Sequence, residues 1–291
     1  MPNIELVQKK DLSSFRRIAI GTWATTYDPS VYGSMTVPAD GCMEYIRKFR
    51  ERTGKKITMT HLMAKIAAAA IAEMPDGNAI LRFNKVYLRK TIGVFFQVAL
   101  EDPETGELDL SGATIFDADS KSLLEIVDEF EAKVAKVRKL KDPALEKTRS
   151  TFKKIPAFML NRILKIISFL CYTLNLDMRW AGLPKDPFGS VMVTNIGSLG
   201  LDQAYVPLVP YSRVPLLIAV GTVKDAAVVK DGEITIAKVM DLSATFDHRL
   251  LDGTHAAVMS KVVHAWFDDP FGHFDDLDAM PGTPNEATDP E

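Results

Sequence analysis

Hydrophobic side chains recur at helical spacing in four stretches of the chain. They are residues 38–52, 58–74, 120–140 and 254–267. Positions three and four apart share one face of a helix, so this spacing predicts four helices. The second is apolar on nearly every face and should be buried. Asp40 is a candidate cap for the first helix, and Asp119 or Ser120 for the third.

Other stretches are alternating or continuously apolar over short runs, as in β-strands. They are residues 81–88, 92–100, 190–194, 216–223 and 233–246. The run at 92–100 is almost wholly apolar, which is typical of a strand covered on both faces. Asp231-Gly232 precedes the last run and predicts a tight hairpin turn.

The order of these elements predicts an α+β fold, with helices laid on a mixed β-sheet. We find no internal repeat and no clear linker, so residues 1–270 are expected to form one domain. Residues 271–291 are acidic and rich in proline, and are expected to form a flexible tail.

Composition narrows the class of protein. The chain has 291 residues, 47% hydrophobic and 25% charged, which is typical of a globular protein. Its net charge of −3 argues against general nucleic-acid binding. Cys42 and Cys171 cannot form a disulfide framework, which favours a reducing, cytoplasmic setting. We see no secretory signal and no apolar run long enough to span a membrane.

The strongest candidate for chemistry is the run Asp247-His248-Arg249-Leu250-Leu251-Asp252-Gly253. It lies between a predicted strand and a predicted helix, where a side chain can project into a cleft. Histidine is the usual general base near neutral pH, so His248 is a candidate base. Asp252 could fix the loop, and Gly253 could provide a backbone angle denied to other residues. Taken alone, a surface histidine beside solvated charges is the commoner arrangement.

A second candidate is the strand end at Thr194 and Asn195, followed by Gly197 and Gly200. A hydroxyl held at a strand end can donate a hydrogen bond to a developing oxyanion. A simple strand-ending turn explains the same residues when they are considered alone. The remaining histidines show no familiar metal-ligand spacing, so no metal is expected. They are His61, His255, His264 and His273.

Together, the two runs resemble the catalytic domain of the dihydrolipoamide acyltransferases, the E2 core subunits of 2-oxo acid dehydrogenase complexes. Chloramphenicol acetyltransferase belongs to the same superfamily and shares the His-x-x-x-Asp-Gly part. Residues 12–17, 58–78 and 207–221 also resemble segments of this domain. The resemblance covers roughly residues 10–140 and 188–270, and is most specific in the last part.

The resemblance implies a chloramphenicol acetyltransferase-like fold and a reaction mechanism. His248 would take a proton from the thiol of coenzyme A or dihydrolipoamide, and the thiolate would attack an acyl thioester. Thr194 would stabilise the oxyanion. Asp252 would hold the loop, with Arg16 as its expected partner, and Asn195 and Gly253 would orient the site. The family places this site between the subunits of a homotrimer.

Departures from the family change the expected assembly. No segment resembles a lipoyl domain or a partner-binding domain, so no covalent lipoyl group is expected on this chain. We therefore expect a separate lipoylated or acyl-carrier partner, with coenzyme A as the acyl-carrying substrate. From Asp268 onward there are eight acidic and no Lys or Arg residues, and no apolar anchor for a larger core. This favours a lone trimer.

An apparent insertion covers residues 141–186. Residues 133–165 hold eleven Lys or Arg and two acidic residues, a local charge of 11 − 2 = +9. The end of this basic segment overlaps an apolar run at residues 155–180. The segment could lie on an anionic membrane through residues 150–180, or bind coenzyme A phosphates or an acidic carrier. It could equally be a packing element with its lysines in water.

Two functions follow for the whole chain. The first is an acyltransferase with His248 as base and Thr194 as oxyanion donor. The alternative is a non-catalytic trimeric scaffold that recruits a dehydrogenase complex or a membrane surface. Turnover that depends on His248 would distinguish them.

Overall fold

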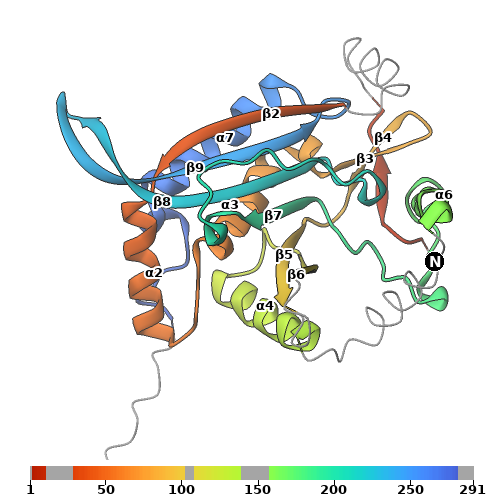
Figure 1. Ribbon diagram of the computed structural model, residues 1–291, viewed down its shortest axis with the longest axis horizontal. Helices are drawn as coiled ribbons and strands as arrows, with labels where there is room; N and C mark the ends of the chain where they lie inside the picture. The colour runs from red at the N-terminus through yellow and green to blue at the C-terminus, as the bar shows by residue number, and fades with distance from the viewer. Residues whose placement is uncertain (1, 11–28, 102–107, 139–156, 281–291) are drawn as a thin grey trace, which may run out of the picture.

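The computed structural model describes residues 2–10, 29–101, 108–138 and 157–280. Arg16 and residues 281–291 of the predicted tail lie outside these residues, whereas Phe274 and Met280 in the first half of that tail are buried in the main core. Within them, two sheets form the framework (Figure 1). The larger has the order β2-β9-β8-β7-β5-β6, with β7 parallel to both neighbours and the other pairs antiparallel. Its strands are β2 (Ser30–Pro38), β5 (Gly93–Glu101), β6 (Leu108–Phe116), β7 (Val191–Asn195), β8 (Leu216–Lys230) and β9 (Glu233–Asp247). The smaller has β1 (Leu6–Gln8), β4 (Lys85–Arg89) and β3 (Ala79–Arg82).

Four helices cover the larger sheet and its ends: α2 (Asp40–Thr53), α3 (Met59–Glu73), α4 (Leu123–Arg138) and α7 (Gly253–Asp268). Figure 1 shows α3 and α7 behind the central strands. The helices and one face of the sheet share the main core, which includes Val191, Val193 and Leu242. Met192 belongs to a smaller cluster, because alternate strand residues point to opposite faces. The expected α+β fold with a mixed sheet is confirmed.

The predicted helices are present, but two caps differ from expectation. Asp40 is the first residue of α2, after Ala39, and its carboxylate accepts a hydrogen bond from the Lys238 backbone N–H at 3.0 Å. Helix α4 begins at Leu123 instead of Ser120. Ser122 Oγ accepts from the Glu125 N–H at 3.2 Å, so Ser122 occupies the capping position.

Two strand predictions needed correction. Residues 81–88 do not form one strand, because Phe83 and Asn84 have φ values of 49° and 57° and make a turn between β3 and β4. Strand β8 continues past its predicted end at Val223 to Lys230, since residues 223–230 pair with residues 233–240 of β9. The predicted turn at Asp231-Gly232 is confirmed, with φ values of 53° and 85°.

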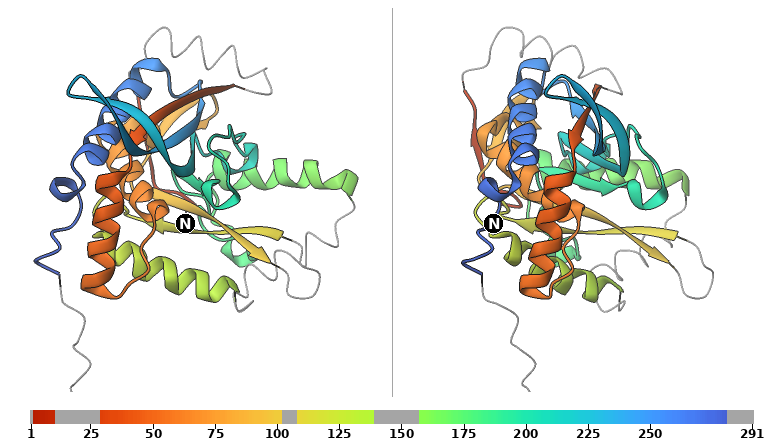
Figure 2. Two further views of the ribbon diagram at one scale, coloured as in Figure 1. Left: turned by 60° about the vertical axis from the view of Figure 1, so that its left-hand side comes forward. Right: turned by 90° about the vertical axis from the view of Figure 1, so that its left-hand side faces the viewer.

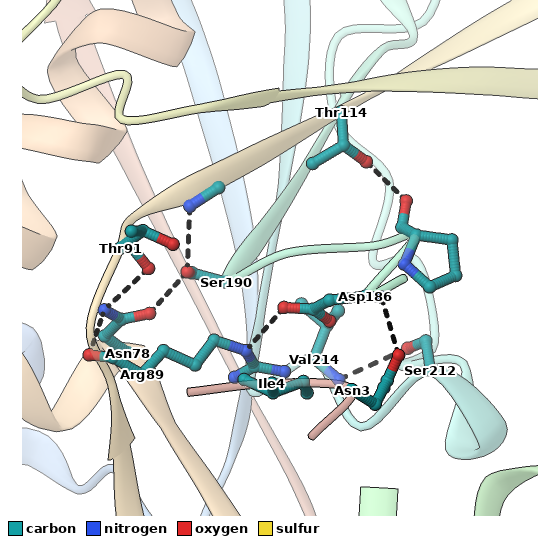
Figure 3. A network of polar contacts seen from close by, with 12 residues as sticks. Asn3, Ile4, Asn78, Arg89, Thr91, Thr114, Asp186, Ser190, Ser212 and Val214 are labelled. Carbon is teal, nitrogen blue, oxygen red and sulfur yellow. Dashed lines mark hydrogen bonds and ion pairs between the residues drawn. The ribbon is translucent and has the colours of Figure 1, made fainter. Parts of the chain in front are cut away.

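A buried ion pair joins the two sheets near the start of β7 (Figure 3). Arg89 Nε donates to Asp186 Oδ2 at 3.2 Å, and both side chains are more than nine-tenths buried. Asn78 Nδ2 donates to the Arg89 carbonyl at 3.1 Å, and Ser190 Oγ donates to Asn78 Oδ1. Ser190 Oγ also accepts from the Gly93 N–H at 3.1 Å. These contacts fix the start of the strand that carries Thr194.

Candidate active site

His248 follows directly on β9, in a loop that backbone hydrogen bonds close tightly. Its N–H donates to the Pro29 carbonyl at 2.9 Å, and the Leu250 and Leu251 N–H groups both donate to the Asp247 carbonyl. The Asp247 carboxylate in turn accepts two hydrogen bonds from the Arg249 guanidinium, at 2.9 and 2.6 Å. A half-buried imidazole is therefore held at the end of a strand, as the sequence predicted.

The ring of His248 is held in one tautomer. Nδ1 lies 2.9 Å from the Leu251 carbonyl oxygen, which can only accept a hydrogen bond. In the neutral ring Nδ1 therefore carries the hydrogen, and Nε2 is the nitrogen that can take up a proton. A general base needs this arrangement.

Asp252 caps the helix that follows the loop. Its Oδ1 accepts from the Thr254 N–H at 3.0 Å, the Thr254 hydroxyl at 2.6 Å and the His255 N–H at 3.3 Å. Burial opposes ionisation of this carboxyl, but the hydrogen bonds from Thr254 and His255 more than offset it. The pKa of Asp252 therefore lies well below its ordinary value. Asp252 therefore fixes the end of the loop by accepting hydrogen bonds from the first N–H groups of α7.

His255 extends this contact to a distant turn, which the sequence analysis missed. Its Nδ1 lies 2.6 Å from Asp252 Oδ1, and its Nε2 lies 3.1 Å from Asp76 Oδ2. Lys9 Nζ donates to both Asp76 oxygens at 2.6 Å. Burial raises the pKa of Asp76, but His255 and Lys9 lower it by more. The chain Lys9–Asp76–His255–Asp252 thus ties the loop to the end of α3 and to β1.

Replacing Asp252 should separate its role as a helix cap from the contribution of its negative charge. Asp252→Ala removes the cap and should lower the free energy of unfolding by about 1–2 kcal/mol. Asp252→Asn keeps an acceptor for the helix N–H groups and should cost less. Because ionised Asp252 has a depressed pKa, its advantage over Asn should be full above about pH 4 and shrink as the pH falls. Urea unfolding at two pH values measures both effects, and a gap that widens in acid would contradict this account.

Thr194 and Asn195 lie at the end of β7. Asn195 Nδ2 donates to Thr60 Oγ1 at 2.9 Å, and Asn195 Oδ1 accepts from the Ser198 N–H at 3.0 Å. Asn195 therefore anchors the strand end to α3. Gly197 follows, where an added Cβ would lie 2.5 Å from the Gly221 carbonyl oxygen. The strand end is consequently rigid, as a positioned hydroxyl requires.

Within one chain, Thr194 and His248 do not meet. Thr194 pairs with Ala219 on β8, and Ala219 pairs with Ser243 on β9. His248 lies five residues beyond Ser243, toward the opposite end of the sheet from the end of β7. A rise of about 3.3 Å per residue and two strand spacings of about 4.8 Å place the two residues on the order of 15–20 Å apart.

Gly253 and Arg16 are the remaining predicted site residues. The special backbone angle expected at Gly253 is not found: Gly253 is the first residue of α7, its φ is not left-handed, and an added Cβ would meet nothing within 4 Å. The helix start supplies an ordinary backbone angle, so glycine is not needed for conformation there. Arg16, the expected partner of Asp252, lies outside the described residues.

Among the described residues, no group of three or more His, Cys, Asp or Glu side chains could hold a metal ion. In the same residues, no helix is long and apolar enough to cross a membrane.

Solved structures define the class of fold. A probable dihydrolipoamide acetyltransferase from Listeria monocytogenes matches with a TM-score of 0.62 and 18% identity, covering 90% of this chain and 95% of that one. The Azotobacter vinelandii dihydrolipoamide acetyltransferase matches at 0.60 and 20%, covering 92% and 93%. Chloramphenicol acetyltransferase matches at 0.50 and 12%, covering 90% and 100%. The chain therefore has the expected chloramphenicol acetyltransferase-like fold.

The family follows from the sequence. The model of the 2-oxoacid dehydrogenases acyltransferase (catalytic domain) family matches residues 8–153 and 187–273, so the chain belongs to this family. The acetyltransferase component of the acetoin cleaving system of Bacillus subtilis is 23% identical over 220 residues, 76% of this chain and 44% of that protein. The corresponding component of the Bacillus subtilis pyruvate dehydrogenase complex is 38% identical over 81 residues, 28% and 18%. The chain thus spans less than half the length of these relatives.

Proposed function

We propose that this chain is an acyltransferase catalytic domain that moves an acyl group between coenzyme A and a dihydrolipoamide-like thiol. The observation that carries the proposal is the single tautomer of His248, whose Nε2 is the basic nitrogen at a strand end. Membership of the acyltransferase family supports the same reaction. Coenzyme A acts here as a substrate.

The reaction needs one base and one oxyanion donor. His248 Nε2 takes the proton of the acceptor thiol, which is mostly protonated at neutral pH. The thiolate attacks the thioester carbonyl carbon, and Thr194 Oγ1 donates a hydrogen bond to the resulting oxyanion. The tetrahedral intermediate collapses by breaking its bond to the donor sulfur, and the departing thiolate takes the proton back from His248. Atoms and charge balance, and the acyl group has changed carriers.

The distance between the two groups supports an active site shared between chains. Because Thr194 and His248 lie toward opposite ends of the sheet within one chain, a site that uses both needs a second copy to supply one of them. A homotrimer provides three such sites in a closed ring. One similar structure, 19% identical with a TM-score of 0.61, is the cubic core of a pyruvate dehydrogenase complex. For this chain we propose a trimer without the larger cubic assembly.

Residue types at the site agree with the proposal, with two differences. The Azotobacter vinelandii structure was determined to study a serine, a histidine and an asparagine in catalysis, the last two being four positions apart. His248 and Asp252 have the same spacing. Thr194 retains the hydroxyl, and Asp252 offers a carboxylate in place of an amide. Its contacts with Thr254 and His255 support a structural role.

Mass spectrometry can test the reaction directly. The chain is incubated with acetyl-coenzyme A and dihydrolipoamide, then with longer acyl-coenzyme A species and with a separate lipoylated domain as acceptor. We expect S-acyl product and free coenzyme A in equal amounts. A stable assembly that transfers none of these acyl groups would contradict the proposal and favour the non-catalytic scaffold.

A further inference from the structure

Helix α6 (Ala157–Ser168) belongs to the segment 154–186 that the family model does not match. Figure 2 shows α6, in bright green, projecting away from the sheets. Its C-terminal end is attached to the body, where Ser168 Oγ accepts from Arg213 Nε at 3.0 Å. Ile167 packs on a small apolar cluster that includes Ile4 and Tyr172. One side of α6 is therefore held, while the other is presented outward.

The outward side carries an exposed stripe that is both apolar and basic. Met159, Ile166 and Phe169 are 42%, 57% and 44% exposed, although all three are large and hydrophobic. Arg162 is exposed between Met159 and Ile166, and the spacing of three and four residues places these three side chains on one face of α6. Phe169 follows directly on α6, as the first residue of a π-helical turn (Phe169–Thr173). Lys165 is exposed beside this face. We call these five residues the α6 stripe.

Charge around the stripe is strongly one-sided. Residues 155–176 contain Arg162 and Lys165 but no Asp or Glu. Both basic side chains are exposed, so this side of α6 is positively charged in a chain whose net charge is −3. An anionic surface would attract this side of α6.

We propose that the α6 stripe docks on an anionic lipid bilayer surface. Apolar side chains interleaved with Arg and Lys suit the boundary between acyl chains and headgroups. Met159, Ile166 and Phe169 would enter the boundary, and the two basic side chains would extend to the phosphates. The β8–β9 hairpin differs from the stripe, because Val229 and Ile234 are exposed among charges of both signs.

Vesicle sedimentation tests the proposal on the full chain. One set of vesicles is pure phosphatidylcholine, and the other is equal parts phosphatidylcholine and phosphatidylglycerol. We expect the chain to sediment with the second set only, and less at high salt. Each basic residue near an anionic surface contributes about 1 kcal/mol, so the double variant Arg162→Gln/Lys165→Gln should bind about 30-fold more weakly. Ile166→Ser/Phe169→Ser should also weaken binding.

Matched controls keep the result specific. Lys261→Gln removes an exposed lysine from α7 and should leave sedimentation unchanged. The oligomeric mass of every variant is measured by light scattering. Wild-type protein that stays in the supernatant with both vesicle sets overturns the proposal. So do stripe variants that sediment like wild type, or that dissociate the oligomer without any change in lipid binding, since the stripe would then be a contact between copies. None of these outcomes depends on acyl transfer.

Discussion

A His248→Ala variant is expected to transfer acyl groups about 10²- to 10⁴-fold more slowly than wild type, which is the usual contribution of a positioned general base. The physical reason is the loss of Nε2, the nitrogen that is basic because Nδ1 donates its hydrogen to the Leu251 carbonyl. His264→Ala, in the same helix–loop region but away from the loop, is the control. Steady-state kinetics with acetyl-coenzyme A and dihydrolipoamide measure the effect. Equal rates for His248→Ala and wild type would remove His248 from the mechanism.

Complementation between two inactive variants extends this test to the shared site. Thr194→Ala should lower kcat about 10²- to 10³-fold through loss of an oxyanion donor. When His248→Ala and Thr194→Ala chains are co-expressed, an interface can combine His248 of one copy with Thr194 of the other. Mixed oligomers should therefore recover part of the activity that neither variant has alone. If both residues acted within one chain, mixing would recover nothing, because every chain would lack one of them.

An Arg89→Met variant is expected to lose about 3–5 kcal/mol of unfolding free energy, because it leaves the buried Asp186 carboxylate without its partner. Burial already raises the pKa of Asp186, and Arg89 opposes that rise. Without Arg89 the pKa should climb further, so the folded state prefers the neutral acid. A raised pKa makes stability fall as the pH rises, and the variant should therefore be least impaired in acid.

The neighbouring Lys90 provides a control of similar chemistry. Its Nζ lies 2.8 Å from Glu5 Oε2, but both side chains are more than half exposed. Solvent screens such a pair, so Lys90→Met should unfold at almost the same urea concentration as wild type. Equal losses in Arg89→Met and Lys90→Met would show that the buried pair has no special role in joining the two sheets.

The sequence was most informative where the signal is local. The period of apolar residues predicted the main helices and the strands β5, β7 and β9, and Asp231-Gly232 predicted the hairpin turn. The order of elements predicted the mixed sheet. The strand predicted over residues 81–88 failed because Phe83 and Asn84 both adopt left-handed backbone angles and form a turn. Asn84 is a favourable residue for such a turn, but Phe83 continues the apolar pattern and hides it.

Contacts between distant segments could not be predicted in this way. His255 and Asp76 are 179 positions apart, and only the packing of α7 beside the end of α3 brings them together. Asp186 pairs with Arg89 across 97 positions for the same kind of reason. No periodicity or motif within either segment indicates its partner.

By itself, the sequence of this chain determined its main helices, several of its strands, its family and the residues with suitable chemistry, because hydrophobic period and motif spacing are properties of neighbouring residues. The tertiary structure alone decided the contact of His255 with Asp76 and the separation of Thr194 from His248. Both depend on strand register and on the packing of segments far apart in the chain, where small shifts in geometry decide which groups meet.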